Sequence, residues 1–383
     1  MIMESLSKNT AEKWIEISKQ ASREIGVYTN KVDEGKSPKE SLDILRQAGL
    51  MGITIPETYG GEGISLDTIS LICKNISKSC LSTGMTYAMH VQQLYIISEF
   101  AKQSLKEKLL PRIAKDNLYI VSVTSKLDVN NTDYAIERVS DLGEASLEFR
   151  RHAPTVTGVS FGDIYLILMT INNVPTFVVA DGRQINNKIL PTWEAMGMRG
   201  TQSCEVTIQG NVPIDHVLDS VDYGQIGNKI MNPIGHILWA YCWLGAVESE
   251  YKKLVKAIRN PEYRYKFKLD SDLLAHQLGE VRCKLDAVDG YLCHFMDYYK
   301  RESQNQLNHS LTYKIKVNNV KIISSEILCK VMDMLVQIGG LKLGYLKNKE
   351  TSIEKIYRDI RSSRLMLSNE KLKIINGKMS LIE

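Results

Sequence analysis

The spacing of hydrophobic residues changes twice along the chain, and this order restricts the folds that the chain can adopt. Residues 1–117 carry apolar side chains at helical spacing, as in Ile69, Ile72 and Ile76. Residues 118–223 form short β-branched segments separated by Asn, Gly, Asp and Pro, which is typical of antiparallel strands. Beyond Ile230 long helical stripes return. The pattern therefore predicts an α+β fold.

We expect three parts in this fold. They are an N-terminal α-helical domain over residues 1–117, a middle antiparallel β-domain over 118–223 and a C-terminal four-helix bundle over 224–383. In the first part, the segment Ser37 to Glu40 predicts a capping box with proline at the first helical position. Pro111 is expected to break a short helix.

Composition excludes several classes of function. The net charge of +4 over 383 residues is too small to indicate nucleic-acid binding. The polar N-terminus lacks the apolar stretch of a signal peptide, and no apolar run approaches the roughly 20 residues of a membrane span. Seven scattered cysteines without a CxxC pair predict free thiols, and His152 and His236 stand alone. We therefore expect a cytoplasmic protein without a metal site.

The segment from Trp193 to Val206, WEAMGMRGTQSCEV, is the most informative motif for function. It joins the strand-like region to an alternating run that begins at Cys204. Two glycines let the backbone turn sharply and leave Arg199, Thr201 and Ser203 free to face a ligand. Arg199 is accordingly a candidate substrate-binding residue.

Four segments together resemble the landmarks of the acyl-CoA dehydrogenase family. They are residues 45–63 (LRQAGLMGITIPETYGGEG), 196–203 (MGMRGTQS), 336–345 (VQIGGLKLGY) and 353–366 (IEKIYRDIRSSRLM). Their order is that of the family, and they span nearly the whole chain. The resemblance implies a helical domain, a β-domain and a helical bundle, with FAD as the cofactor. It also implies a homodimer or homotetramer in which each flavin is shared across an interface.

The resemblance points to cofactor-binding residues in the β-domain. The segment Val123-Thr124-Ser125 lies where the family has a strand ending in Thr-Glu that holds the flavin ring. Thr124 matches this pattern, whereas Ser125 replaces the glutamate. Thr157 is a further candidate for a flavin contact, although the aromatic residue that the family places nearby is missing.

Further cofactor candidates lie in the C-terminal part. Gly339 and Gly340 end a predicted helix, where free N–H groups and missing side chains allow a pyrophosphate to approach. The alternative is an ordinary glycine cap. Gln337 and Gln277 are candidates by position, with a lone polar residue on a buried helix and a solvent-facing residue as their respective alternatives. Arg264, in a basic run, is the remaining candidate.

The residue that would serve as catalytic base departs from the family's pattern. Dehydrogenation beside a thioester carbonyl needs a base for the α-proton, which the family supplies as a glutamate nine residues beyond the arginine of its Arg-Asp pair. Counting from Arg358 gives Leu367, which has no proton chemistry. Glu262, 17 residues beyond Gly245, and Glu248 are the candidate replacements. For each of them, a solvated surface glutamate is the alternative, and it is the more common role of such a residue.

Three functions follow from the resemblance. The preferred one is α,β-dehydrogenation of an acyl thioester, carried by CoA or a carrier protein, with hydride transfer to FAD. The first alternative is a flavin-dependent monooxygenase on the same fold, for which polar groups such as His90, Gln92, Ser122 and Ser125 would lie near the flavin. His90 is accordingly a candidate substrate-site residue, and a structural histidine is the alternative. The second alternative is a non-catalytic binding subunit.

The expected partners are an acyl thioester and an electron acceptor, which is either another flavoprotein or oxygen. A run of basic residues could meet the acidic surface of an acyl or peptidyl carrier protein, although such a run is usually a solvated face. Its members are Lys252, Lys253, Lys256, Arg259, Arg264, Lys266 and Lys268.

Overall fold

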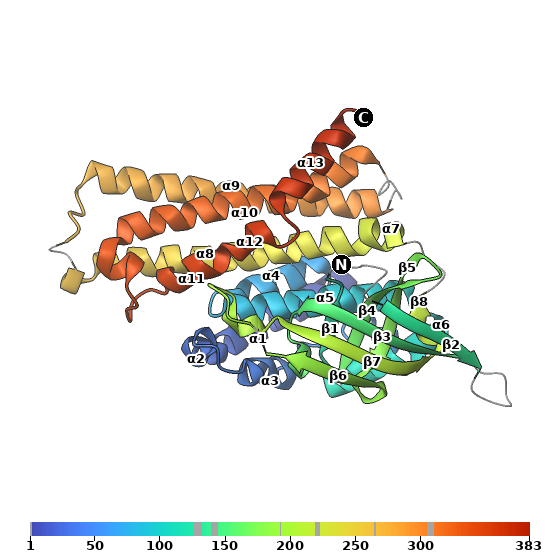
Figure 1. The fold of residues 1–383 in the computed structure, drawn as a ribbon. Helices are drawn as coiled ribbons and strands as arrows, with labels where there is room; N and C mark the ends of the chain where they lie inside the picture. The colour runs from blue at the N-terminus through green and yellow to red at the C-terminus, as the bar shows by residue number, and fades with distance from the viewer. Residues whose placement is uncertain are drawn as a thin grey trace.

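The computed structural model describes most of the chain as helices and two small sheets (Figure 1). The described ranges are 2–125, 132–138, 145–191, 193–218, 223–263, 266–304 and 310–383. Helices come first, strands follow, and helices return. This order confirms the predicted α+β class.

The N-terminal helices form one layer of the molecule. They are α1 (Ile2–Gly26), α2 (Thr29–Asp33), α3 (Lys39–Gln47), α4 (Leu66–Ser77), α5 (Leu81–Phe100) and α6 (Gln103–Asp116), with a 3-10 turn, η1 (Glu57–Tyr59), before α4.

Two local predictions in this layer are wrong. Pro38 precedes α3 and does not occupy its first position, and Ser37 Oγ accepts from the Lys39 N–H at 3.1 Å in place of a capping box. Helix α6 continues through Pro111 because it buries Leu105, Leu109, Leu110 and Ile113, and this burial outweighs the lost hydrogen bond.

Two four-stranded sheets make the middle part. Their strands are β1 (Ile120–Val123), β2 (Thr132–Arg138), β3 (Ala145–Val156), β4 (Ile164–Ile171), β5 (Val174–Asp181), β6 (Ile185–Leu190), β7 (Cys204–Pro213) and β8 (Val217–Leu218). The orders are β1-β4-β5-β8 and β2-β3-β7-β6. The pair β1–β4 is parallel, with Ile120 opposite Ile164, so the first sheet is mixed where an antiparallel domain was expected. Short 3-10 turns interrupt the strands at η3 (Val159–Phe161), η4 (Gly182–Gln184), η5 (Arg199–Thr201) and η6 (Ile214–His216).

Three long helices dominate the C-terminal part and run side by side in Figure 1. They are α8 (Asn232–Arg259), α9 (Asp272–Gln304) and α10 (Leu311–Gly340). The fourth arm of the bundle is interrupted, because it consists of α11 (Ile353–Ile360) and α12 (Ser362–Leu365), after which α13 (Asn369–Ser380) turns away (Figure 1). Shorter elements complete this part: α7 (Tyr223–Ile226), η7 (Gly227–Met231), η8 (Pro261–Tyr263) and η9 (Leu341–Tyr345).

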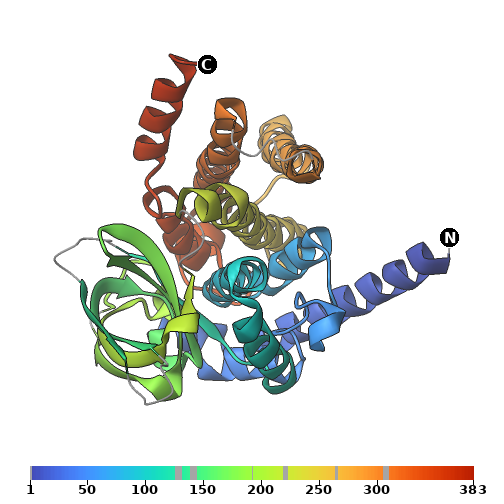
Figure 2. The ribbon, with the colours of Figure 1, turned by 90° about the vertical axis from the view of Figure 1, so that its right-hand side faces the viewer.

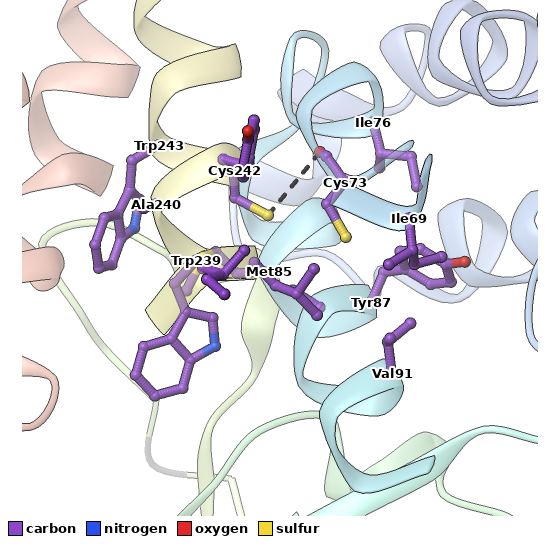
Figure 3. Close-up of a cluster of buried hydrophobic side chains, with 14 of the residues drawn as sticks. Ile69, Cys73, Ile76, Met85, Tyr87, Val91, Trp239, Ala240, Cys242 and Trp243 are labelled. Atoms are coloured by element: carbon purple, nitrogen blue, oxygen red, sulfur yellow. Dashed lines mark hydrogen bonds between the residues drawn. The ribbon is translucent and has the colours of Figure 1, made fainter. Parts of the chain in front are cut away.

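The main core lies where α4 and α5 pack against α8. Figure 3 shows Cys242 facing Cys73 in this core, where the Cys242 thiol donates toward the Cys73 carbonyl at 3.9 Å. The sheets lie on one side of these helices, and α1 projects from the other (Figure 2). A second core cluster fills the β-domain. Helix α5 packs against β1, which is the edge strand of the first sheet.

The structure also bears on the expectations from composition. None of the seven cysteines, all of which lie in the described ranges, forms a disulfide, as expected. Among the described residues, no group of His, Cys, Asp and Glu side chains is arranged to hold a metal ion. No helix in the described ranges combines the length and the apolar character that crossing a membrane requires.

Candidate functional site

A cavity of about 300 Å³ lies between the β-domain, helices α5 and α8, and the segment after α12. Its described lining combines eight hydroxyl side chains with methionine, tryptophan, leucine and glutamine. The lining residues are Met85, Met89, Gln92, Ser122, Thr124, Ser125, Thr155, Thr157, Trp193, Met198, Thr201, Ser203, Met231, Trp239, Ser362, Met366 and Leu367.

The end of strand β1 supplies one polar wall of the cavity. Ser122 Oγ and Thr124 Oγ1 are 3.3 Å apart, and the backbone leaves the sheet immediately after Val123. Ser125 Oγ is buried and has no hydrogen-bond partner among the described residues. Because an unpaired buried hydroxyl is costly, this atom points to a ligand that completes its hydrogen bonding.

A chain of hydroxyl groups joins the glycine-hinged loop, which is residues 193–203 with Gly197 and Gly200, to the residue that follows strand β3. Thr157 Oγ1 lies 2.9 Å from Ser203 Oγ, and Ser203 Oγ lies 2.8 Å from Thr201 Oγ1. Thr201 donates onward to the Met198 carbonyl at 2.8 Å. The network gives this wall a fixed direction of hydrogen bonding, because Thr201 cannot donate back to Ser203.

The rest of the lining is apolar and polarizable. It contains five methionines together with Trp193 and Trp239. Trp193 Nε1 donates to the Met198 carbonyl at 3.0 Å, whereas the buried Trp239 Nε1 has no partner in the described structure. Methionine and tryptophan make favourable contacts with flat rings. The hydroxyl groups and the apolar side chains of the lining together suit a planar molecule with one polar edge.

No acidic, basic or histidine side chain is among the described residues that line this cavity. A charged atom placed against the apolar wall would therefore lose its hydration without gaining a partner. The cavity favours neutral ligand groups.

The glycine-hinged loop is held against helix α11. A Cβ on Gly197 would lie 2.3 Å from the Arg358 carbonyl oxygen, so only glycine permits this approach. The Met198 N–H donates to Asp359 Oδ1 at 2.5 Å, and burial raises the pKa of Asp359 to about 6. Arg358 makes two hydrogen bonds to Asp33, at 3.0 and 2.7 Å. The Arg-Asp pair therefore anchors the loop.

The predicted cofactor residues divide into two groups. Thr124, Ser125 and Thr157 line the cavity, whereas Val123 is buried within β1 and does not. The remaining described candidates, Gln277, Gln337, Gly339 and Gly340, lie on α9 and at the end of α10, outside this lining.

Helix α10 ends at its glycine pair, as predicted, and the cofactor contact of these glycines stays a prediction. Gly340 is the last residue of the helix and has a φ of 58°. Gln337 is exposed, although its alternative interpretation placed it on a buried helix. Arg264 lies outside the described residues.

Neither glutamate predicted as a base lines the cavity. Glu248 accepts from Lys74 Nζ at 2.9 Å, and the same lysine binds Asp289 at 3.0 Å. Glu262 is exposed, with 58% of its side chain accessible, and lies 3.7 Å from Lys349 Nζ. Leu367, the position that the family's spacing singled out, does line the cavity.

The two candidate substrate residues, His90 and Arg199, lie outside the described lining of the cavity. His90 Nε2 donates to the Met51 carbonyl at 2.8 Å, and its Nδ1 accepts from the Ile120 N–H at 3.0 Å. Arg199 donates to the carbonyls of Ala195 and Asp33. Both side chains form hydrogen bonds with backbone groups, so we assign them structural roles.

Acidification is expected to destabilise the protein through its buried histidines. Burial lowers the pKa of His90 and of His236 to about 4, below the ordinary 6.5. The unfolded chain therefore binds more protons between these values, and the stability present above pH 6.5 is lost as the pH falls toward 4. Each histidine should cost about 2 kcal/mol at pH 5. The raised pKa of Asp359 acts in the opposite direction below pH 6.

A His90 variant separates the contribution of His90 to this pH dependence of stability from the contributions of His236 and Asp359. The loss of unfolding free energy between pH 7 and pH 5, measured by urea denaturation, should be smaller in His90→Asn by about 2 kcal/mol. An equal loss in both proteins would show that His90 does not carry this dependence.

Several cavity residues escaped the sequence analysis. Met85 and Trp239 carry no motif, since an apolar side chain on a helix is usually part of a core. Met366 ends the segment 353–366 but had no assigned role. Ser362 follows the Arg-Asp pair but had no assigned role. Leu367 did have a signal in the sequence, because its spacing from Arg358 marked it as the position where the family's glutamate base is missing.

Comparison with known proteins gives two family matches. The model of the acyl-CoA dehydrogenase N-terminal domain matches residues 16–117, and that of the C-terminal domain matches residues 234–367. A probable acyl-CoA dehydrogenase of Bacillus subtilis is 23% identical over 350 residues, which cover 85% of this chain. The chain spans 58% of that relative's length.

Two solved structures are similar in fold. Dibenzothiophene monooxygenase from Paenibacillus sp. A11-2 superposes with a TM-score of 0.81 at 16% identity, covering 97% of both chains. Butyryl-CoA dehydrogenase from Megasphaera elsdenii superposes with a TM-score of 0.78 at 18% identity, covering 97% of this chain and 98% of that one. At such identities the likeness concerns the fold alone.

Proposed function

We propose that this chain, which belongs to the acyl-CoA dehydrogenase family, is an FAD-dependent oxidoreductase that acts on a neutral, largely apolar substrate. The two family models together match more than half of the chain, in agreement with the motifs at its two ends.

The cavity residues fit a flavin ring. Such a ring is flat, with a polar edge and an apolar edge. The unpaired Ser125 Oγ and Trp239 Nε1, together with Thr124 and Thr157, offer hydrogen bonds to the polar edge, and the methionines offer packing for the rest. When bound, FAD supplies a redox centre that accepts or donates two electrons.

The observation that favours one reaction is the absence of a proton acceptor among the described lining residues. Removal of an α-proton needs a base within hydrogen-bond reach, and Leu367 stands where the family's spacing would place it. Monooxygenation needs no such base. One oxygen atom of O₂ enters the substrate and the other leaves as water, with two electrons and two protons drawn from the reduced flavin. We therefore favour a flavin-dependent monooxygenase.

A second candidate function is α,β-dehydrogenation of an acyl thioester. The family and the relative from Bacillus subtilis support it. It would require a base from outside the cavity lining, and Glu262 and Glu248 would have to leave their positions beside Lys349 and Lys74. In this case the exposed Lys252, Lys256 and Arg259 of α8 could receive an acidic carrier protein.

The residues at the end of α10 remain proposals for the adenosine end of the cofactor. They would act from a second copy of the chain, in a homodimer or homotetramer. Leu341 and Tyr345, which follow Gly340, are 66% and 68% exposed, so this end of the bundle presents apolar surface.

An absorption spectrum of the purified protein tests the proposal. We expect a bound or readily added flavin that stays oxidised when acyl thioesters are added without oxygen. Reduced flavin from a separate reductase should then consume oxygen faster when a neutral apolar substrate is present. Bleaching by an acyl thioester would favour the dehydrogenase instead. A protein that takes up no flavin would leave the non-catalytic binding subunit.

A further inference from the structure

A second cavity of about 260 Å³ lies beyond the first, between η7, α10 and α13. Its lining differs from that of the first cavity, because it contains three asparagines, a tyrosine and a lysine beside aliphatic residues. The described lining is Asn228, Asn232, Tyr313, Lys314, Val317, Asn318, Leu367, Leu372, Ile375 and Met379. Tyr313 is fully buried, and its hydroxyl has no partner in the described part of the chain.

Leu367 belongs to the lining of both cavities. Its backbone has a φ of 43°, a conformation that is unusual for a residue other than glycine. The residue connects α12 to α13, so no helical hydrogen bonding of its own fixes it there. A residue in this conformation persists only where its surroundings hold it.

The side chain of Lys321 provides that hold. Lys321 lies on α10 and is fully buried, and its Nζ donates to the Leu367 carbonyl at 3.1 Å and to Asn369 Oδ1 at 2.5 Å. Asn369 in turn donates to Ser325 Oγ at 3.0 Å and to Glu326 Oε1 at 3.3 Å. Residue 367 is therefore tied through one ammonium group to the interior of the bundle.

We propose that Lys321 fixes Leu367 as a partition between the two cavities, and that this partition limits how far a substrate can extend from the first cavity into the second. Lys321 acts here as a positioning residue, and Leu367 determines specificity for length. The inference deepens the proposed function and rests on it, because the first cavity is taken to be the site of reaction.

The chemistry of the second cavity indicates which molecules would benefit from an open partition. A linear apolar chain would pack on Val317, Leu372 and Ile375, and a neutral hydroxyl or carbonyl at its far end would meet the unpaired Tyr313 hydroxyl. With the partition in place, the same chain has no room beyond Leu367. Short chains should be insensitive to the partition, and long ones should be excluded.

Binding of two linear alcohols, 1-hexanol and 1-decanol, to the purified protein tests this. Trp193 and Trp239 line the first cavity and report occupancy by fluorescence. Each additional buried methylene contributes about fourfold in affinity, so the four extra methylenes of 1-decanol should raise its affinity measurably once the cavity has room for them. In Leu367→Ala we expect 1-decanol to bind at least about 10-fold more tightly than in the unmodified protein, with 1-hexanol changed by less than about threefold.

Lys321→Met should shift the preference toward 1-decanol in the same direction, and Lys321→Gln, which keeps a hydrogen-bond donor, should restore part of the discrimination. Leu372→Ala is the matched control, because it removes wall from the second cavity alone and should leave the 1-hexanol preference unchanged. Thermal melts identify any variant that fails to fold, and Asn369→Ala, which removes the second acceptor of Lys321, then replaces Lys321→Met.

The outcomes separate the partition from the reaction. Equal discrimination in the unmodified protein and in folded Leu367→Ala would overturn the partition, whatever reaction the protein carries out. Altered discrimination only in Leu367→Ala, with Lys321→Met and Asn369→Ala like the unmodified protein, would overturn the role of Lys321. Because the readout is ligand binding, a failure of the oxygen assay would not affect it.

Discussion

A Leu367→Glu variant is expected to exchange the α-hydrogens of a short acyl-CoA thioester, a reaction that the unmodified chain should not support. Leu367 lines the cavity in which Thr124, Ser125 and Thr157 form the polar wall. A carboxylate at this position would join a cavity whose described lining holds no other acidic or basic side chain, where it could take up a proton from the thioester. A positioned general base contributes about 10²- to 10⁴-fold to such a step.

Mass spectrometry of the thioester after incubation in D₂O measures this exchange. Leu365→Glu is the matched control, because Leu365 is two residues away, 77% exposed and absent from the cavity lining. The control should behave like the unmodified chain. If the unmodified chain already exchanges α-hydrogens as fast as Leu367→Glu, some other residue acts as the base, and dehydrogenation would replace monooxygenation as the better proposal.

Gly245→Ala is expected to lower the free energy of unfolding by about 3 kcal/mol. Gly245 lies on α8 where the helix crosses α4, and a Cβ there would come within 2.2 Å of the Lys74 carbonyl oxygen. That atom belongs to the backbone of a packed helix, so relief requires the two helices to separate. Separation would also disturb the ion pair between Lys74 and Glu248.

A glycine-to-alanine substitution in another helix should raise the free energy of unfolding instead. Gly290 lies within α9, and a Cβ there would meet no atom within 4 Å. Gly290→Ala should therefore stabilise the protein by about 0.5 to 1 kcal/mol, because alanine loses less backbone entropy in a helix. Denaturant unfolding of both variants measures the two effects. A destabilisation by Gly245→Ala of less than about 1 kcal/mol would show that α4 and α8 adjust easily.

The hydrophobic periods of the sequence were sufficient to predict the order of helices and strands. Periodicity is a local property, since each helix or strand must present one apolar face whatever it packs against. Pairing between distant strands is not local, and the parallel pair of β1 and β4 was therefore missed. The continuation of α6 through Pro111 was missed for a related reason, because burial of its apolar face outweighs the local signal of proline.

The candidate site was predictable only where a continuous motif carries it. Thr124, Ser125 and Thr157 belong to such motifs, and the structure brings all three to one cavity. Its apolar wall was hidden, because Trp239 on α8 and Met85 on α5 look like ordinary core residues until the two helices are placed side by side. The hydrogen bonds of His90 were also hidden from the sequence, because its backbone partners at Met51 and Ile120 are far away along the chain.

The sequence by itself determined the order of the helical and strand-forming regions and that position 367 carries no proton acceptor. Only the tertiary structure decided that Leu367 lies between two cavities, because that position depends on the buried ammonium of Lys321 on another helix. The chemistry of each side chain is known from the sequence alone. The surroundings of a residue depend on contacts between distant segments, and these form only when the chain packs.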